Sequence, residues 1–185
     1  MRIAFFGYDF FVDGLKAVLA AGHELVYVQT MDVDNQDYNY NQQVQHLAAA
    51  AGAPCFIGKL TEAHRQALLL QRPDVLLCAA YGFKVPVATL APLPCVNVHP
   101  TKLPEGKGAW PLPHLILRGV TDSAVTLHMM TEDWDSGDII CHTPVTIDPD
   151  RDDLESVSAK IRLATVRLLA DWAQDIPGHL ARAQP

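Results

Sequence analysis

Asp74-Val75-Leu76-Leu77-Cys78-Ala79-Ala80 is the stretch of this sequence that decides the fold. Its apolar residues follow one another without alternation, which is typical of a strand buried on both faces of a parallel sheet. The next strand is predicted at residues 95–99, where the run CVNVH is cut off by a proline. Ligands bind at the carboxyl ends of the strands in open parallel sheets, so the end of this strand is a place to search for function.

The residues before this stretch predict alternating strands and helices. A short β-rich run at residues 2–6 ends at Gly7, helical spacing follows through Leu15, Val18 and Leu19, and residues 23–29 indicate a second strand. Residues 32–43 are polar and predict a surface loop that leads into a helix at 41–51. A short strand at 55–57 and a helix from an N-cap at Thr61 to Gln71 complete the pattern. Such alternation predicts an α/β fold with a mostly parallel sheet and helices on both faces.

The residues after the second buried strand predict a different order of elements. Residues 101–113 are rich in Gly and Pro and indicate a loop, followed by a short helical piece at 114–118 and strands at 123–130 and 138–147. Apolar residues at helical spacing then predict one long helix that ends at Pro177-Gly178. No repeat or linker interrupts the sequence, and we expect a single domain over residues 1–185.

Composition excludes several classes of protein. The chain has 185 residues, 49% of them hydrophobic, and a formal net charge of −7. The hydrophobic fraction is enough for one buried core, and the negative net charge disfavours a nucleic-acid partner. The longest apolar run, residues 75–83, is far shorter than the roughly 20 residues of a bilayer span, and the N-terminus lacks a secretory pattern. We therefore expect a cytoplasmic protein with no membrane partner.

Metal binding and disulfides are also not expected. No two of the eight histidines stand at the i, i+4 spacing that places two ligands on one helix face, and the sequence has no CxxC motif. The four cysteines are widely spaced and are predicted to be free thiols in a reducing compartment.

Three polar side chains are candidates for chemistry. Asn97 and His99 alternate along one predicted strand and so share a face, and Asp135 lies in the loop Trp134-Asp135-Ser136-Gly137, where Gly137 is expected to allow a sharp turn. An amide donor, an imidazole and a carboxylate can together stabilise an oxyanion and move a proton. Taken singly, such residues more often have a structural role, as a strand histidine, a cap or a turn.

Four segments in a fixed order resemble the formyltransferase family that uses 10-formyltetrahydrofolate. Its signature N-x-H-P-S-x-L-P, a glycine pair, T-x-H and D-x-G-x-I is similar to Asn97-Val98-His99-Pro100-Thr101-Lys102-Leu103-Pro104, Gly106-Lys107-Gly108, Val125-Thr126-Leu127-His128 and Asp135-Ser136-Gly137-Asp138-Ile139. The resemblance is to the N-terminal catalytic domain of the methionyl-tRNA members. It implies a Rossmann-like sheet with antiparallel strands at one edge, and it places the catalytic residues at Asn97, His99 and Asp135.

The same resemblance implies where the folate co-substrate binds. In the family, main-chain groups of two loops hold the pterin ring, and the matching segments here are Phe83-Lys84-Val85-Pro86 and Thr131-Glu132-Asp133-Trp134-Asp135. The side chains of Tyr81, Phe83 and Val85 are expected to wall the slot. Phe83 and Trp134 are also compatible with ordinary core or surface positions. No metal is implied.

The acceptor of the formyl group stays open at this level. The residues after the first strand, Gly7-Tyr8-Asp9-Phe10, lack the phosphate-binding loop of the purine-pathway members, and the acidic composition disfavours transfer RNA. We expect a small-molecule or carrier-bound amine, such as an amino sugar, an amino acid or an aminoacyl group, with Tyr8, Asp9, Tyr38 and Tyr40 as candidate contacts. The alternatives are a hydrolase that releases formate from the same folate and a binding module without turnover.

Overall fold

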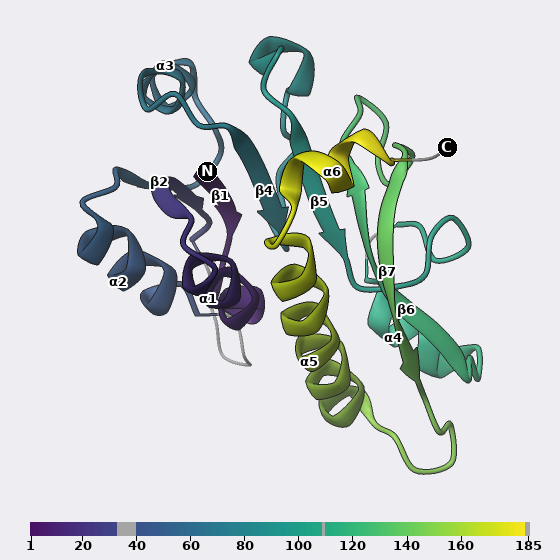
Figure 1. The fold of residues 1–185 in the computed structure, drawn as a ribbon. Helices are drawn as coiled ribbons and strands as arrows, with labels where there is room; N and C mark the ends of the chain where they lie inside the picture. The colour runs from purple at the N-terminus through teal and green to yellow at the C-terminus, as the bar shows by residue number, and fades with distance from the viewer. Residues whose placement is uncertain (33–39, 109, 184–185) are drawn as a thin grey trace.

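The computed structural model describes residues 1–32, 40–108 and 110–183 and contains one seven-stranded sheet in the order β3-β2-β1-β4-β5-β6-β7 (Figure 1). The first five strands in this order are parallel, β6 is antiparallel to β5, and β7 is antiparallel to β6. Their bounds are β1 (Arg2–Gly7), β2 (Glu24–Thr30), β3 (Cys55–Ile57), β4 (Val75–Ala79), β5 (Cys95–His99), β6 (Asp122–Met129) and β7 (Ile139–Thr146). The expected mostly parallel, Rossmann-like sheet with antiparallel edge strands is confirmed.

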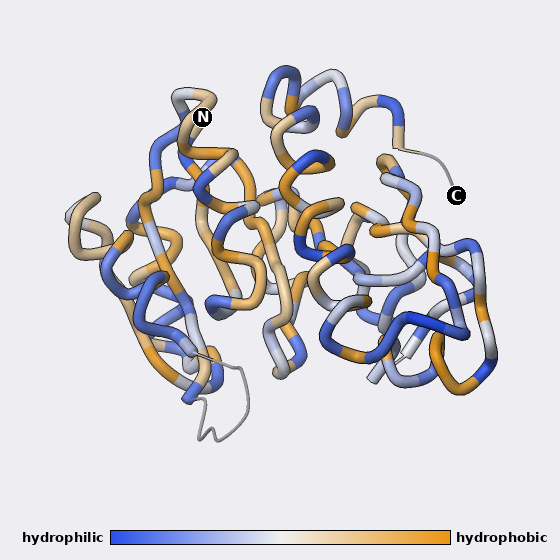
Figure 2. The backbone as a smooth tube through the Cα atoms, turned by 90° about the horizontal axis from the view of Figure 1, so that it is seen from below, coloured by the Kyte–Doolittle hydropathy of each residue, from blue (hydrophilic) through white to orange (hydrophobic). Residues whose placement is uncertain are grey.

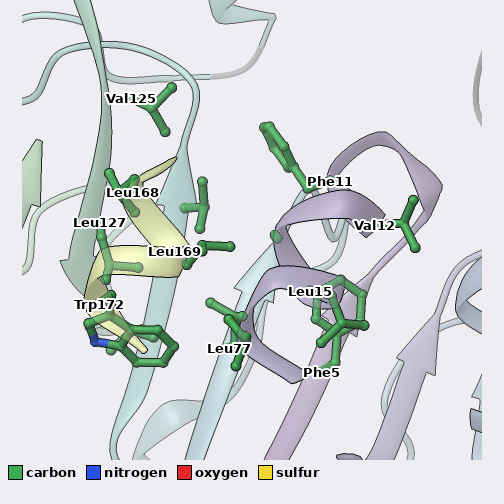
Figure 3. Close-up of a cluster of buried hydrophobic side chains, with 14 of the residues drawn as sticks. Phe5, Phe11, Val12, Leu15, Leu77, Val125, Leu127, Leu168, Leu169 and Trp172 are labelled. Atoms are coloured by element: carbon green, nitrogen blue, oxygen red, sulfur yellow. The ribbon is translucent and has the colours of Figure 1, made fainter. Parts of the chain in front are cut away.

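Helices cover both faces of the sheet, unequally. One face packs against α1 (Val12–Ala20), α2 (Gln42–Ala51), α4 (Pro111–Leu117), α5 (Leu154–Trp172) and α6 (Ile176–Ala181). The other face packs against α3 (Glu62–Leu70) and the short 3-10 helix η2 (Val87–Leu90); a second 3-10 helix, η1 (Asp9–Phe11), precedes α1. Figure 3 shows the larger core, where Leu15 of α1 and Leu169 of α5 meet Phe5 and Leu77 of the sheet.

The period-two alternation of a strand divides the apolar residues between the two cores. In β1, Ile3 and Phe5 face the core under α1 and α5, whereas Ala4 and Phe6 face the core under α3. All four side chains are fully buried. Hydrophobic segments accordingly run through the middle of the molecule in Figure 2.

Two predicted helix boundaries are wrong, and in both cases a proline that was expected outside a helix or at its end lies in the first turn of one. The last long helix ends at Trp172 rather than at residues 177–178, and a separate helix, α6, begins after Asp175, whose side chain accepts a hydrogen bond from the Gly178 N–H. The short helix predicted at 114–118 already begins at Pro111. The N–H groups in the first turn of a helix have no acceptor within the helix. Proline, which has no N–H, therefore fits there and lies at the start of these helices.

The sheet changes its direction of winding between β1 and β4, which are hydrogen-bonded neighbours. The chain passes from β1 to β2 on one side and from β4 to β5 on the other, which makes this a topological switch point. A Cβ at Gly7 would overlap the Ala79 carbonyl oxygen, so the two strand ends lie too close for any other residue. Asn97 and His99 stand near the same edge, at the carboxyl end of β5.

Among the described helices, none combines the length and the apolar character that a membrane crossing requires.

Candidate active site

His99 is buried at the end of β5 with an acceptor at each ring nitrogen. Its Nε2 atom lies 2.9 Å from the Gly106 carbonyl oxygen, and its Nδ1 atom lies 3.4 Å from Oδ1 of Asp135. A carbonyl oxygen can only accept, so Nε2 carries a hydrogen. The nitrogen that is free to gain or lose a proton is therefore Nδ1, beside the carboxylate.

The loop of residues 101–108 holds the carbonyl group that fixes this ring. The Thr101 hydroxyl, itself buried, donates to the same Gly106 oxygen at 2.7 Å, and the Gly106 N–H donates to the Lys102 carbonyl at 2.7 Å. A Cβ at Gly106 would overlap the Thr101 side chain. Glycine at this position thus allows the loop to close tightly over the imidazole.

Asp135 reaches the same place from the loop after β6. It adopts the left-handed backbone conformation with φ 51°, and its side chain is nearly buried. Its Oδ2 atom accepts a hydrogen bond of 3.1 Å from the Gly108 N–H, which leaves Oδ1 for His99. The sharp turn that the sequence led us to expect at Gly137 is made by Asp135 itself, since Gly137 has no positive φ; a Cβ at Gly137 would instead overlap the Met129 carbonyl oxygen.

Asn97 meets the other two candidates through a residue that the sequence analysis did not single out, His128. These two residues are directly paired between β5 and β6, and Nδ2 of Asn97 lies 3.1 Å from Nε2 of His128. The same Nε2 atom is 3.8 Å from Oδ1 of Asp135. The available signal was the T-x-H motif itself, which places Thr126 and His128 two residues apart on one face of an apolar strand.

The three candidate residues thus come from two separate stretches of the chain, β5 and the loop after β6. A buried imidazole beside a carboxylate, with an amide nearby, can stabilise negative charge on a bound carbonyl oxygen and transfer a proton. Each group is held by backbone hydrogen bonds or by a strand pair, so little motion is needed to assemble the site.

The two loops expected to hold the folate also approach one another. Glu132 accepts a hydrogen bond of 3.0 Å from the Ala88 N–H at the start of η2 and lies 3.7 Å from the Lys84 ammonium group. A cavity of about 270 Å³ between these loops is lined by Lys59, Leu60, Lys84, Pro86 and Glu132. None of the three candidate catalytic side chains lines it.

The side chains of these loops divide into buried and exposed sets. Tyr81 and Val85 are buried in the core under α3, and the Tyr81 hydroxyl donates to the Gly58 carbonyl at 2.8 Å. Phe83 is 37% exposed and Trp134 is 60% exposed. Thr131 donates to the Asp133 carbonyl at 3.0 Å, within its own loop. The two exposed aromatic side chains are open to a ligand without rearrangement, whereas Tyr81 and Val85 are not.

Asp9, one of the candidate contacts for the amine acceptor, has a structural role. Both carboxylate oxygens of Asp9 accept hydrogen bonds of 3.0 Å from the first turn of α2, at the N–H groups of Gln43 and Val44. Asp9 therefore caps this helix from a distant part of the chain. Tyr8 is partly buried and Tyr40 is exposed, while Tyr38 lies outside the described residues.

Neither a metal cluster nor a reactive thiol is indicated by the described part of the chain. No group of three His, Cys, Asp or Glu residues there is arranged to hold a metal ion. Burial raises the pKa of the Cys78 and Cys95 thiols to about 12, so neither is a thiolate nucleophile at neutral pH.

Comparison with known proteins identifies the family of this chain. The family model described as formyl transferase matches residues 1–172. A methionyl-tRNA formyltransferase from Pelotomaculum thermopropionicum is 31% identical over 193 residues, which cover 100% of this chain and 61% of that protein. The chain spans about a third to three-fifths of the length of such curated relatives.

Solved structures share the fold at lower identity. Phosphoribosylglycinamide formyltransferase from Streptococcus pneumoniae TIGR4 has a TM-score of 0.75 and 24% identity, and the match covers 95% of this chain and 98% of that one. A formyltetrahydrofolate deformylase from Pseudomonas syringae pv. tomato has a TM-score of 0.76 and 20% identity over 98% and 62% of the two chains. With a family match that spans nearly the whole chain, this protein belongs to the formyl transferase family.

Proposed function

We propose that this chain transfers a formyl group from 10-formyltetrahydrofolate to a primary amine by direct attack, with Asn97, His99 and Asp135 as the catalytic residues. The observation that carries the proposal is the fixed imidazole of His99, with Nε2 bound to the Gly106 carbonyl and Nδ1 facing Asp135. The family generally uses formyltetrahydrofolate, which supports the choice of donor.

The chemistry needs no covalent enzyme intermediate. The amine nitrogen attacks the formyl carbon, a C–N bond forms, and the carbonyl oxygen becomes an oxyanion. An Asn97 N–H and a protonated His99 Nδ1 would stabilise this charge, and removal of one such donor typically costs roughly 2.7–4 kcal/mol of barrier. The bond from carbon to the folate nitrogen then breaks, and that nitrogen receives the proton that the amine loses.

Asp135 has two roles in this scheme. Its charge stabilises the imidazolium form of His99, because an opposite charge nearby favours the protonated ring. The lone pairs of its Oδ1 atom can also take the proton from the attacking amine, directly or through a water molecule, and pass it toward the leaving nitrogen. The 3.4 Å separation from Nδ1 is longer than a short hydrogen bond, as is common for catalytic pairs without substrate.

The folate would bind between the loops of residues 81–86 and 131–135. Glu132 connects the two sides through its hydrogen bond from the Ala88 N–H and its ion pair with Lys84. The side chains of Phe83 and Trp134 are exposed. Aromatic faces suit a flat heterocycle, and main-chain N–H and C=O groups supply donors and acceptors for its ring nitrogens.

The acceptor is proposed to be a small-molecule or carrier-bound amine. The curated relatives are named for methionyl-tRNA, which favours an aminoacyl amine, and the solved relatives include one named for phosphoribosylglycinamide. The amine must be uncharged to attack the formyl carbon, and the Asp9 carboxylate is already engaged as the cap of α2.

Incubation of the purified chain with 10-formyltetrahydrofolate tests the proposal. The amine panel contains an amino sugar nucleotide, free amino acids, methionyl-tRNA and glycinamide ribonucleotide, and the products are tetrahydrofolate, formate and the formylated amine. Formylation of one amine, with little formate released in its absence, supports the transferase. Rapid formate release without amine indicates the hydrolase, and folate binding without either product indicates a binding module.

A further inference from the structure

His128 is a buried titratable residue to which the proposed reaction gives no role. His128 is 2% exposed on β6, and its two ring nitrogens have partners of different kinds. Nδ1 lies 2.8 Å from the Met129 carbonyl oxygen, and Nε2 lies 3.1 Å from the Asn97 amide nitrogen. These two contacts determine which nitrogen carries the proton.

The Met129 carbonyl can only accept, so Nδ1 must donate to it. In a neutral ring, Nε2 then carries no hydrogen and accepts a hydrogen bond from the Asn97 N–H. Both ring nitrogens, the Met129 carbonyl and this Asn97 N–H each have a partner. The charged ring would instead point an N–H at the Asn97 amide nitrogen, which is also a donor. With the Asn97 amide nitrogen facing the ring, this geometry fits the uncharged form of His128.

The surroundings of the His128 ring shift its pKa in both directions. Burial is the main cause that lowers the pKa of His128, and the nearby charges of His99 and Lys107 act in the same direction. The Met129 carbonyl and the Asp135 carboxylate act in the opposite direction. A neutral ring leaves Oδ1 of Asp135 to His99, because only a protonated Nε2 would compete for that oxygen across 3.8 Å.

We propose that His128 is a positioning residue that receives one Asn97 N–H and thereby aims the other amide hydrogen at the oxyanion. This inference rests on the proposed function. An unrestrained Asn side chain can turn its amide by half a turn and present its oxygen, which would repel the developing charge. The acceptor at Nε2 of His128 makes the orientation with the nitrogen toward His128 the favourable one.

Two isosteric variants separate this role from packing. In His128→Gln the side-chain amide oxygen can reach the place of Nε2 and accept from Asn97. In His128→Asn the shorter amide reaches only the place of Nδ1, so the Met129 contact is kept and the Asn97 contact is lost. We expect His128→Asn to lower kcat at least tenfold with the KM for 10-formyltetrahydrofolate changed less than threefold, and His128→Gln to keep at least a third of kcat. Equal loss in the two variants would overturn the proposal.

A double-mutant cycle with Asn97→Ala tests whether His128 acts through Asn97. Once Asn97 is gone, His128→Asn should cost less than twofold in kcat. A cost as large as in the wild-type background overturns the inference alone. Full activity of both Asn97→Ala and His99→Ala overturns the proposed function, and the inference with it.

The tautomer of His128 can also be measured in the wild-type protein, so this test does not depend on whether a variant folds. Nitrogen-15 NMR of the imidazole groups at pH 7 should show His128 with Nδ1 protonated and Nε2 unprotonated. The opposite tautomer or a doubly protonated ring overturns the proposal.

Discussion

The imidazole of His99 is held by one neutral and one charged acceptor. The Gly106 carbonyl keeps a proton on Nε2, and the Asp135 carboxylate faces Nδ1, so only one nitrogen can take part in proton transfer. Both side chains of the pair are 7% exposed, where charges interact more strongly than in bulk water.

His99→Ala removes the proposed cation at the oxyanion. We expect the rate of formyl transfer to fall at least a hundredfold, while the affinity for tetrahydrofolate changes little because the ring lies outside the two folate loops. Stopped assays of product and a binding titration measure the two quantities. His46→Ala, at an exposed position on α2, is the matched control. Retention of more than about a tenth of the rate would contradict the role of His99.

Asp135→Asn removes a charge with little change of shape. Asn tolerates the left-handed backbone at this position and can still accept from the Gly108 N–H. Without the carboxylate, the proton of the attacking amine has no acceptor beside His99, so we expect the rate of formyl transfer to fall at least tenfold at pH 7. Stopped assays of the formylated product measure the rates of the variant and of the wild type. A rate within threefold of the wild type would show that the Asp135 carboxylate is not needed.

His128 links stability to pH through its own burial. Its pKa is below the ordinary value in the folded chain because burial disfavours the charged ring, whereas the unfolded chain binds a proton below about pH 6.5. The stability due to a neutral His128 is therefore present above that pH and is lost as the pH falls, by at most about 1.4 kcal/mol per pH unit. Urea unfolding at pH 7.5 and pH 5.5 should show a larger loss for the wild type than for His128→Gln. Equal losses would mean that His128 does not titrate differently on unfolding.

At the scale of elements, the strands were easier to predict than the loops and short helices. The predicted strand at residues 95–99 has the same bounds as β5, because an apolar run ended by proline leaves little choice. The starts of α4 and α6 were missed, since Pro111 and Pro177 are compatible with either a loop or a first helical turn. The long loops depend on contacts with distant residues, which local sequence does not specify.

Asp9 illustrates such a contact between elements. Asp9→Ala should lower the free energy of unfolding by about 1 kcal/mol, because two N–H groups of α2 lose their acceptor. Asp9→Asn keeps an acceptor oxygen and should lose less. Chemical denaturation measures the stability, and the KM for the amine should be unchanged in Asp9→Asn. A KM raised fivefold or more in this variant would show that Asp9 contacts the acceptor.

At the scale of the whole molecule, two cores share a single sheet. Leu76 and Leu77 are neighbours in β4 and are both fully buried, but they belong to opposite cores. Since each strand backbone is common to both cores, neither core can unfold while the other keeps its sheet intact.

Leu76→Ala and Leu77→Ala test the prediction that residues 1–185 form a single domain. Each should lower the free energy of unfolding by about 2–5 kcal/mol, and the far-UV circular dichroism and Trp172 fluorescence transitions should stay superimposed in both variants. Trp172 is fully buried, whereas Trp110 and Trp134 are exposed, so a change in fluorescence reports mainly on the larger core. Separate transitions in either variant would mean that the chain contains more than one folding unit.

The sequence by itself determined the strands, the mostly parallel sheet and the family, because apolar runs and ordered motifs are local properties of the chain. It also identified Asn97, His99 and Asp135 as candidates, although their roles stay proposals. Only the tertiary structure revealed the Gly106 carbonyl behind His99, the left-handed backbone of Asp135 and the pairing of Asn97 with His128. The physical reason is that hydrogen-bond partners and ring tautomers depend on groups that the fold brings together from separate stretches of the chain.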